Sequence, residues 1–393
     1  MIIAIIVKSL VSIFFVRDFH SVEDWTIAMN LVNGYGYSYI PAVGPTALKM
    51  PLYPLFLSLP IIIFGDEKLF PVLMQHVLVS FSALGIFRIS EHFFSKKVSL
   101  WLGVLFLLHP SYFYYSNTLE ITNLFVPAFV AATYFFLNFM GRGHQDRYIL
   151  FSILLGALAS ALLQLQPVVL PVIGTAIAYM VASKRWKQAL VVTATGILLL
   201  APWTVRNYCE FGKFMPLKSP VWMNFYLGYW QTAPKYVMVS DSLHREIFDN
   251  EVTKFNDIEM EARYKSIAYP IITNDIPLYL EKTACQAYLY WTYPPRYDGD
   301  KSLSFLVVRK IPNFILTVAL AVSLFIAYRR NRKFFWSTIL ILAYFTAVYA
   351  STSVLNIRYK LDIEWIEIVC LGFLISALAK RTGEMVDLCA PKL

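Results

Sequence analysis

Charged residues are scarce in this sequence. They make up 15% of its 393 residues, whereas 58% are hydrophobic; ordinary soluble domains carry about 25% charged residues. Apolar stretches of about 20 residues recur along the chain, which is the pattern of membrane-spanning helices. The composition therefore excludes an ordinary soluble globular domain and predicts an all-α polytopic membrane protein.

Motifs for common nucleotide and hydrolase chemistries are also missing. The sequence contains no Walker loop, dinucleotide fingerprint, HExxH or GxSxG, so ATP-, NAD-, zinc-protease and serine-hydrolase functions have no motif support. The four cysteines have no metal-ligand spacing. Cys209 and Cys285 could both lie outside the membrane and pair, or remain free thiols. No cleavable signal peptide is recognisable, so the first segment is expected to be an anchor.

The net charge of +9 could suggest nucleic acid as a partner. The basic residues, however, lie in short clusters between apolar stretches, and such clusters normally set membrane topology. We therefore expect the lipid bilayer, and no nucleic acid, among the partners.

Ten membrane spans are predicted from the apolar stretches. They cover about 1–16, 69–93, 98–112, 121–140, 148–166, 167–183, 188–203, 305–328, 334–350 and 363–379. A basic cluster follows every second span, so all the clusters fall on one side, which the positive-inside rule makes cytoplasmic. Both termini are then cytoplasmic, in an inner or plasma membrane.

The apolar segment 51–65 would reverse this topology if it crossed the membrane. It has only 15 residues and contains Pro54 and Pro60, and proline ends or kinks a helix. We therefore expect it to lie in the interface or to re-enter without crossing.

Two long loops remain on the extracytoplasmic side, at 17–68 and 204–304. They divide the chain into an N-terminal transmembrane module (1–203) that carries the first loop, an outer loop (204–304), and C-terminal transmembrane helices with a short tail (305–393). Within the outer loop, the apolar spacing predicts amphipathic helices over 246–268 and 277–291.

Acidic and basic side chains beside the outer boundary are the candidates for chemistry. Asp24 precedes an apolar stretch; it could act as a general base or simply cap a helix. Lys49, Arg206 and Arg358 lie on the outer side, against the positive-inside bias. They could bind the phosphate of a lipid head group or only anchor the chain to anionic lipid. Glu120 could line the site or cap a helix.

Several short patterns occur in a characteristic order along the chain. They are Asp24 before Ala28, Asn30, Leu31, Gly34, Gly36 and Tyr37; Gly44-Pro45-Thr46 with Lys49, Pro51, Leu52, Tyr53 and Pro54; His109-Pro110; 202–208 with Phe211-Gly212; 224–228; and 358–361. With them the chain resembles the GT-C superfamily of polyprenyl-phosphate-sugar-dependent glycosyltransferases, which includes protein O-mannosyltransferases and lipid A aminoarabinose transferases. The resemblance covers most of the chain.

This resemblance implies a GT-C bundle of about ten transmembrane helices, with interfacial helices in the outer loops. It implies an inverting transfer of a monosaccharide from a polyprenyl phosphate, undecaprenyl or dolichyl, to an extracytoplasmic protein, lipid or glycan. Asp24 would be the base, with Glu23 as its substitute or partner and Asp18 as a further alternative.

The resemblance also suggests residues that would contact the substrate. Lys49, Arg206 and Arg358 would hold the donor phosphate. Further substrate contacts are suggested for Tyr53, Asn117, Glu120, Asn207, Tyr359 and Lys360. Some relatives use a divalent metal, for which this sequence shows no recognisable ligands, and no other cofactor is implied.

Two other functions compete with transfer. A transporter or flippase of lipid-linked sugars would bury polar residues in the middle of its spans, and mid-span charge is expected to be nearly absent apart from Lys8. A non-catalytic membrane scaffold would not need Lys49, Arg206 and Arg358 to converge.

Overall fold

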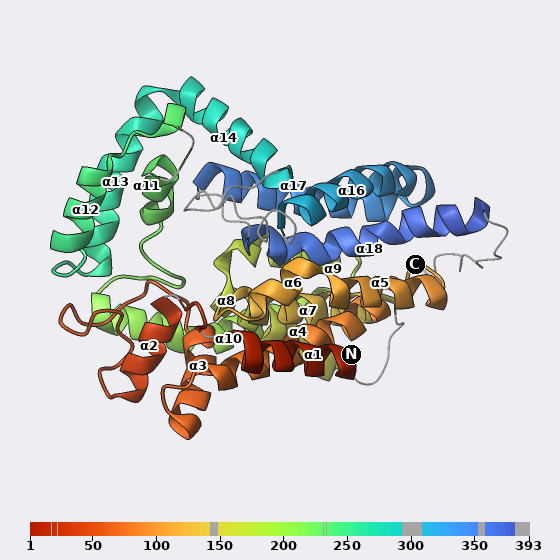
Figure 1. Cartoon of the computed structure of the whole chain (residues 1–393), viewed down its shortest axis with the longest axis horizontal. Helices are drawn as coiled ribbons and strands as arrows, with labels where there is room; N and C mark the ends of the chain where they lie inside the picture. Colours follow the sequence, from red (N-terminus) through yellow and green to blue (C-terminus); the bar gives the residue numbers. More distant parts are fainter. Residues whose placement is uncertain are drawn as a thin grey trace.

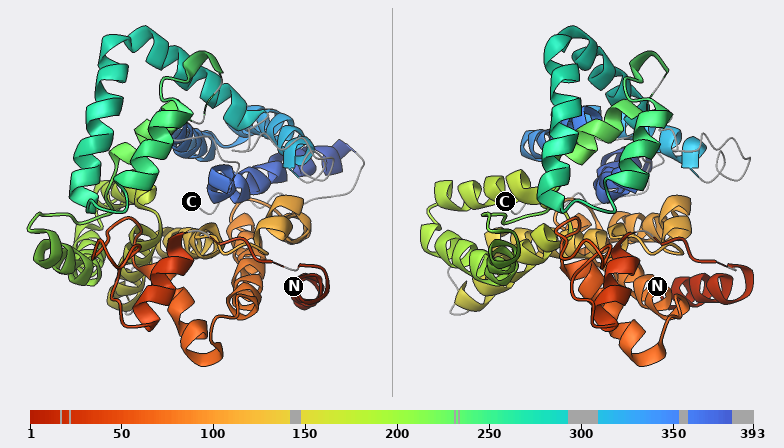
Figure 2. Two further views of the ribbon diagram at one scale, coloured as in Figure 1. Left: turned by 60° about the vertical axis from the view of Figure 1, so that its left-hand side comes forward. Right: turned by 90° about the vertical axis from the view of Figure 1, so that its left-hand side faces the viewer.

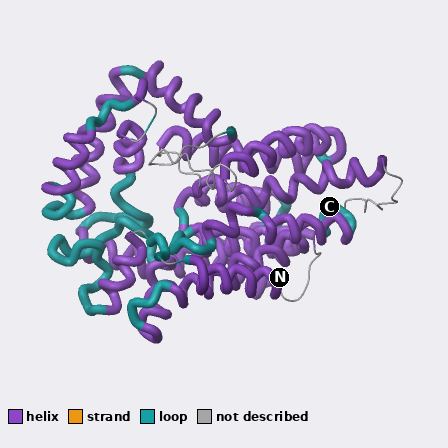
Figure 3. The backbone as a smooth tube through the Cα atoms, in the orientation of Figure 1, coloured by secondary structure: helices purple, strands orange, loops and turns teal. Residues whose placement is uncertain are grey.

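The computed structural model describes residues 1–16, 18–21, 23–141, 148–230, 232, 234–292, 309–352 and 358–381. Within these ranges all the regular elements are helices, joined by loops (Figure 3). The prediction of an all-α chain is therefore confirmed.

Two sets of helices follow one another along the chain. The first set is α1 (Ile2–Phe15), α2 (Glu23–Val32), α3 (Leu52–Phe64), α4 (Leu69–Ser90), α5 (Lys96–Leu108), α6 (Pro110–Tyr115), α7 (Thr122–Gly141), α8 (Tyr148–Leu165), α9 (Leu170–Ala182) and α10 (Trp186–Phe211). The second set is α11 (Trp222–Trp230), α12 (Asp241–Asn250), α13 (Asp257–Asn274), α14 (Ile276–Trp291), α16 (Ile311–Arg330), α17 (Arg332–Thr352) and α18 (Arg358–Arg381).

The long helices form a bundle, and the two outer-loop segments lie together at one end of it. Figure 1 shows α2 and α11–α13 at this end, whereas α1 begins and α18 ends at the other. Figure 2 shows α11–α14 as a separate layer that α14 joins back to the bundle. The two predicted loops are therefore neighbours in space.

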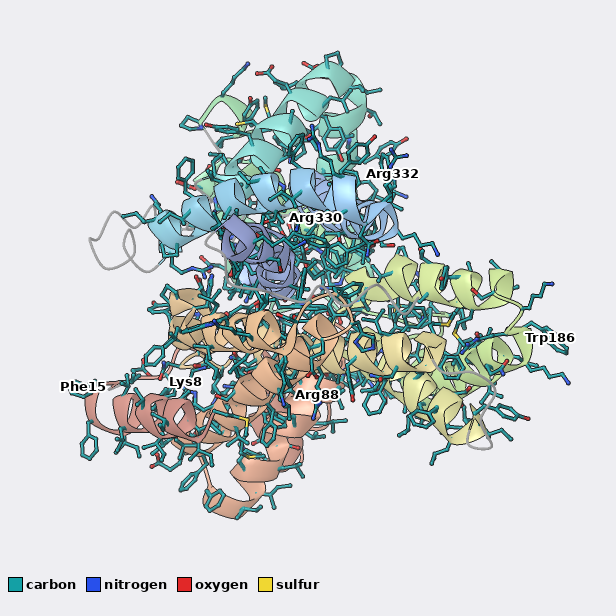
Figure 4. The ribbon with its side chains drawn as sticks, turned by 90° about the vertical axis from the view of Figure 1, so that its right-hand side faces the viewer. Lys8, Phe15, Arg88, Trp186, Arg330 and Arg332 are labelled. Carbon is teal, nitrogen blue, oxygen red and sulfur yellow. The ribbon has the colours of Figure 1, made fainter. Side chains whose placement is uncertain are left out.

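Basic residues gather at the opposite end of the bundle. Figure 4 looks onto that end, with Arg88, Arg330 and Arg332 labelled at the end of α4 and at the turn from α16 to α17. Of these residues, Arg330 and Arg332 belong to a predicted basic cluster, and the assignment of the clusters to the cytoplasmic side stays a prediction.

In the part of the chain that the structure describes, six helices are long and apolar enough to cross a membrane, namely α4, α7, α8, α10, α16 and α17. Shorter apolar helices occupy Ile2–Phe15, Leu52–Phe64 and Pro167–Ala182, and each falls on a segment discussed above as apolar. The total of about ten spans stays a prediction.

Some predicted boundaries were wrong. The seventh predicted span, 188–203, is part of α10, which continues to Phe211 and ends at Gly212 with φ of 65°; glycine adopts this left-handed conformation at little cost. The third, 98–112, is interrupted at His109. The helix predicted over 246–268 is two helices, since Asn256 starts α13 with a capping box. Cys209 and Cys285 are both free.

Small residues allow close contact between the helices. A Cβ added to Gly156 of α8 would lie 2.6 Å from the backbone oxygen of Val192 in α10, and one added to Gly372 of α18 would lie 2.3 Å from the ring of Phe94. Small residues at such crossings let helices pack closely in a membrane. Burial of apolar surface does not drive helix association there, because the lipid is equally apolar.

Helix α18 lies at the centre of the bundle and carries buried charge. Asp362, Glu364 and Glu367 are each 0% exposed. The expectation that mid-span charge is nearly absent apart from Lys8 was therefore wrong. Asp362 accepts hydrogen bonds from Thr122, Gln166 and Tyr349, which joins α18 to three other parts of the bundle. Lys8 is itself buried, on the side of α1 that faces the bundle (Figure 4).

Candidate active site

The first turn of α2 presents two acids with different surroundings. Glu23 and Asp24 are its first two residues, where the helix dipole favours negative charge. The side chain of Asp24 is 2% exposed, and that of Glu23 is 30% exposed. Asp24 Oδ1 is buried, and no group among the described residues donates a hydrogen bond to it. One oxygen of a buried carboxylate is thus left available as a proton acceptor.

Lys49 pairs with both acids. Its Nζ lies 3.1 Å from Glu23 Oε2 and 3.6 Å from Asp24 Oδ2. Lys49 lowers the pKa of Glu23 to about 2, whereas burial raises the pKa of Asp24 despite the opposing charge of Lys49. Burial works to lower the pKa of Lys49, yet the two carboxylates raise it above its usual range. Lys49 is therefore fully charged at neutral pH.

Arg358, the first residue of α18, adds a second cation to this group. Its guanidinium pairs with Glu120, and its charge acts on Glu23, Asp24 and Lys49. The backbone fixes this neighbourhood as well, since the amide of Leu119 donates to the carbonyl of His20 over 2.8 Å. Arg358 and Glu120, which are 238 positions apart in the sequence, thereby meet near Asp24.

Lys218 is a third cation of the group, and sequence reasoning missed it. Its charge interacts with Lys49, Asp24, Arg358 and Glu23, and burial together with the cations lowers its pKa to about 8. Among the described residues, no hydrogen bond or ion pair holds its ammonium. The signal that could have found it is the one that singled out Lys49: a lysine in a predicted outer loop, outside the predicted amphipathic helices.

Arg206 lies beside the first loop, with its guanidinium already bonded. It donates to the carbonyls of Thr46 (2.8 Å) and Tyr37 (3.1 Å), and it stacks over the rings of Tyr37, Trp203 and Phe211. The structure thus brings Lys49 and Arg358 together, whereas the guanidinium of Arg206 is bonded to the backbone of the first loop. Its predicted contact with phosphate stays a prediction.

The remaining predicted substrate residues contact other protein groups. Tyr53 donates to Gln75, Asn117 accepts from Ser12, and Asn207 donates to the carbonyls of Met215 and Leu217. Tyr359 stacks on Tyr349, and Lys360 is fully buried beside Asn313, Thr317 and Glu367. The bonds of Asn207 to Met215 and Leu217 hold the loop segment that immediately precedes Lys218. Substrate contacts by these residues stay predictions.

No group of three or more His, Cys, Asp or Glu side chains within the described ranges could hold a metal ion. The side chain of Asp18 is 90% exposed, and its Oδ1 lies 3.9 Å from Lys68 Nζ.

A family model described as dolichyl-phosphate-mannose-protein mannosyltransferase matches residues 46–205. The match includes Lys49 and Glu120 but not Asp24, Lys218 or Arg358. No curated protein sequence matches the chain.

Solved structures of similar fold include two of the oligosaccharyltransferase from Archaeoglobus fulgidus. One is in complex with an inhibitory peptide and a dolichol-phosphate, and the other is tethered to an acceptor peptide that contains the NVT sequon. Each is 13% identical to the chain, with a TM-score of 0.58 over 97% of it, and the chain spans 50% of the length of that protein.

Residues 46–205 are therefore similar in sequence to the dolichyl-phosphate-mannose-protein mannosyltransferase family, and the chain shares the fold of the oligosaccharyltransferase, which agrees with the expected resemblance. These similarities also agree with the apolar helices in making the chain an integral membrane protein.

Proposed function

We propose that this GT-C chain is an inverting glycosyltransferase. It would move a monosaccharide from a polyprenyl phosphate, undecaprenyl or dolichyl, to a hydroxyl group of an extracytoplasmic protein, lipid or glycan. One observation carries the proposal: a buried carboxylate with an uncommitted oxygen lies beside a group of cations contributed by three distant segments of the chain.

Asp24 is the proposed base. The acceptor oxygen attacks the anomeric carbon from the face opposite the phosphate, its proton passes to Asp24, and the bond to the phosphate oxygen breaks. A raised pKa makes a carboxylate a stronger base at neutral pH, and burial raises that of Asp24. Glu23, whose pKa is lowered to about 2, is a poorer base, and its role is to hold Lys49.

Lys49, Lys218 and Arg358 are the proposed binding groups for the donor phosphate. The leaving group gains negative charge as the glycosidic bond breaks, and cations placed there in advance stabilise that charge. Lys218 is the most readily engaged of the three, because Lys49 and Arg358 already pair with carboxylates.

The test uses purified protein in nanodiscs with a panel of polyprenyl-phosphate sugars and envelope acceptors. We expect one donor to be consumed, with release of the polyprenyl phosphate and an inverted anomeric configuration in the product. Lys218→Ala should raise the KM for that donor more than it changes kcat. An absence of turnover with every donor, or retention of configuration, would contradict the proposal.

The buried acids of α18 favour a second candidate, transport of a lipid-linked sugar. Ionisable residues inside spans commonly mark translocation paths, and within the described ranges neither oxygen of Glu364 accepts a hydrogen bond. Proteoliposomes distinguish the two functions: a transporter would move an intact polyprenyl-phosphate sugar between leaflets without consuming it, whereas the transferase would consume it and leave the leaflets unmixed.

A further inference from the structure

Asp257, on the outer-loop helix α13, reaches across to the first loop. Its Oδ2 accepts hydrogen bonds from the hydroxyl of Thr46, over 2.9 Å, and from the backbone amide of Ala47. These two residues are three and two positions before Lys49. Both bonds are accepted by the same carboxylate oxygen. Thr46 and Ala47 therefore need a hydrogen-bond acceptor at this position.

Asp257 is not needed to cap its own helix. It is the first residue of α13, a position where an acid often serves the helix N-terminus. Here the capping box of Asn256 and Glu259 already caps the N-terminus of α13. The Asp257 carboxylate is therefore directed at the other loop.

Three further residues hydrogen-bond to the same short segment. Arg206 of α10 donates to the carbonyl of Thr46, and the amide of Ser219 donates to the carbonyl of Ala47 over 3.0 Å. The hydroxyl of Tyr37 donates to the carbonyl of Lys49 over 3.1 Å. The backbone at residues 46–49 is thus held by several hydrogen bonds, and Asp257 supplies those that come from α13.

Helix α13 is firmly part of the outer layer. Glu261 accepts the backbone amide of Trp222 over 2.9 Å, and Met260 and Tyr264 belong to a buried cluster with Tyr226 of α11. A displacement of this layer would therefore pull on the turn that carries Lys49.

We propose that Asp257 is a positioning residue, which ties the outer layer to the placement of Lys49 against Glu23 and Asp24. The inference rests on the proposed function only for its kinetic consequence. In that function Asp257 touches no substrate, and it acts by fixing the backbone from which Lys49 reaches the phosphate.

The first test does not depend on activity. In Asp257→Ala, amide hydrogen exchange of the segment 46–49 and acylation of the Lys49 amine should both accelerate, because the turn loses two hydrogen bonds. Asp257→Asn should keep both rates near wild type, since its amide oxygen can accept the same bonds. Asp249→Ala, an exposed acid of α12, is the matched control. Unchanged rates in Asp257→Ala would overturn the proposal.

The second test is kinetic. Asp257→Ala should raise the KM for the donor about tenfold, and in a Lys49→Ala background it should have little further effect. An equal loss in both backgrounds would show that Asp257 does not act through Lys49 and would overturn the proposal. If wild type turns over no donor, the proposed function fails, and the exchange and acylation rates alone decide whether Asp257 positions Lys49.

Discussion

Two adjacent acids, Glu23 and Asp24, differ in chemistry because they differ in surroundings. Lys49 is the dominant influence on Glu23 and lowers its pKa to about 2, whereas burial dominates at Asp24 and raises its pKa. Acids whose pKa values are pushed apart commonly divide their roles in catalysis. In our account one carboxylate holds the cation and the other takes the proton.

The pKa of Lys218 leads to a prediction about pH. Its pKa is lowered to about 8, so its ammonium is lost as pH rises through that value, and donor binding should weaken above about pH 8. Lys218→Arg keeps its charge throughout this range. We expect the KM for the donor to rise between pH 7 and 9 in wild type and to stay level in the arginine variant. Parallel profiles for the two proteins would contradict this role.

The sequence located some of these residues but not their relations. Asp24, Lys49 and Arg358 stood out because charge beside an outer boundary is unusual, and they meet in the structure. Arg206 stood out for the same reason, yet its guanidinium is bonded to backbone carbonyls. Pattern alone cannot tell a cation that faces the substrate from one that holds a loop, since that depends on contacts between distant segments.

At the scale of elements, α10 extends beyond its apolar stretch and holds the first loop with Arg206. Arg206→Ala removes bonds to the carbonyls of Thr46 and Tyr37, each worth about 1.5–3 kcal/mol because the donor is charged. We expect limited proteolysis within residues 37–49 to become at least tenfold faster. Arg206→Lys should recover only part of the protection, because one ammonium cannot reproduce the fork. An unchanged cleavage rate in Arg206→Ala would be inconsistent with this account.

The contact between α8 and α10 gives a second prediction at this scale. Gly156→Leu would force a side chain against Val192 and Thr195, since even a Cβ would lie 2.6 Å from the nearest backbone atom. We expect a loss of about 1–3 kcal/mol, seen as a lower midpoint of thermal aggregation in detergent. Gly174→Leu, where a Cβ meets nothing within 4 Å, is the control. Equal midpoints for the two variants would contradict the close packing.

The predicted element boundaries agree with the structure only where hydrophobicity determines them. The long apolar stretches became α4, α7, α8, α16 and α17. The split between α12 and α13 was missed because it depends on a polar cap at Asn256, and the tenth span was judged apolar although it contains Glu364 and Glu367. A window average of hydropathy conceals both capping residues and paired charges.

For the whole molecule, the grouping of both outer-loop segments at one end of the bundle predicts how the native cysteines react. Cys209 is exposed near the end of α10 at which the first loop lies. In a protein whose other cysteines are replaced by serine, a membrane-impermeant maleimide should label Cys209 in intact cells. A cysteine in place of Lys184, in the turn at the opposite end of α10, should be labelled only after permeabilisation. The reverse pattern would invert the proposed orientation.

In the proposed mechanism Asp24 receives the proton of the acceptor, beside cations that hold the donor phosphate. This role is tested most directly by comparing Asp24→Asn with Glu23→Gln and Asp18→Asn in single-turnover transfer, together with the affinity of each protein for the polyprenyl phosphate. Loss of a general base costs about a hundredfold or more in rate. We expect such a loss in Asp24→Asn alone, with binding of the polyprenyl phosphate retained. Transfer at the wild-type rate in Asp24→Asn would exclude Asp24 as the base.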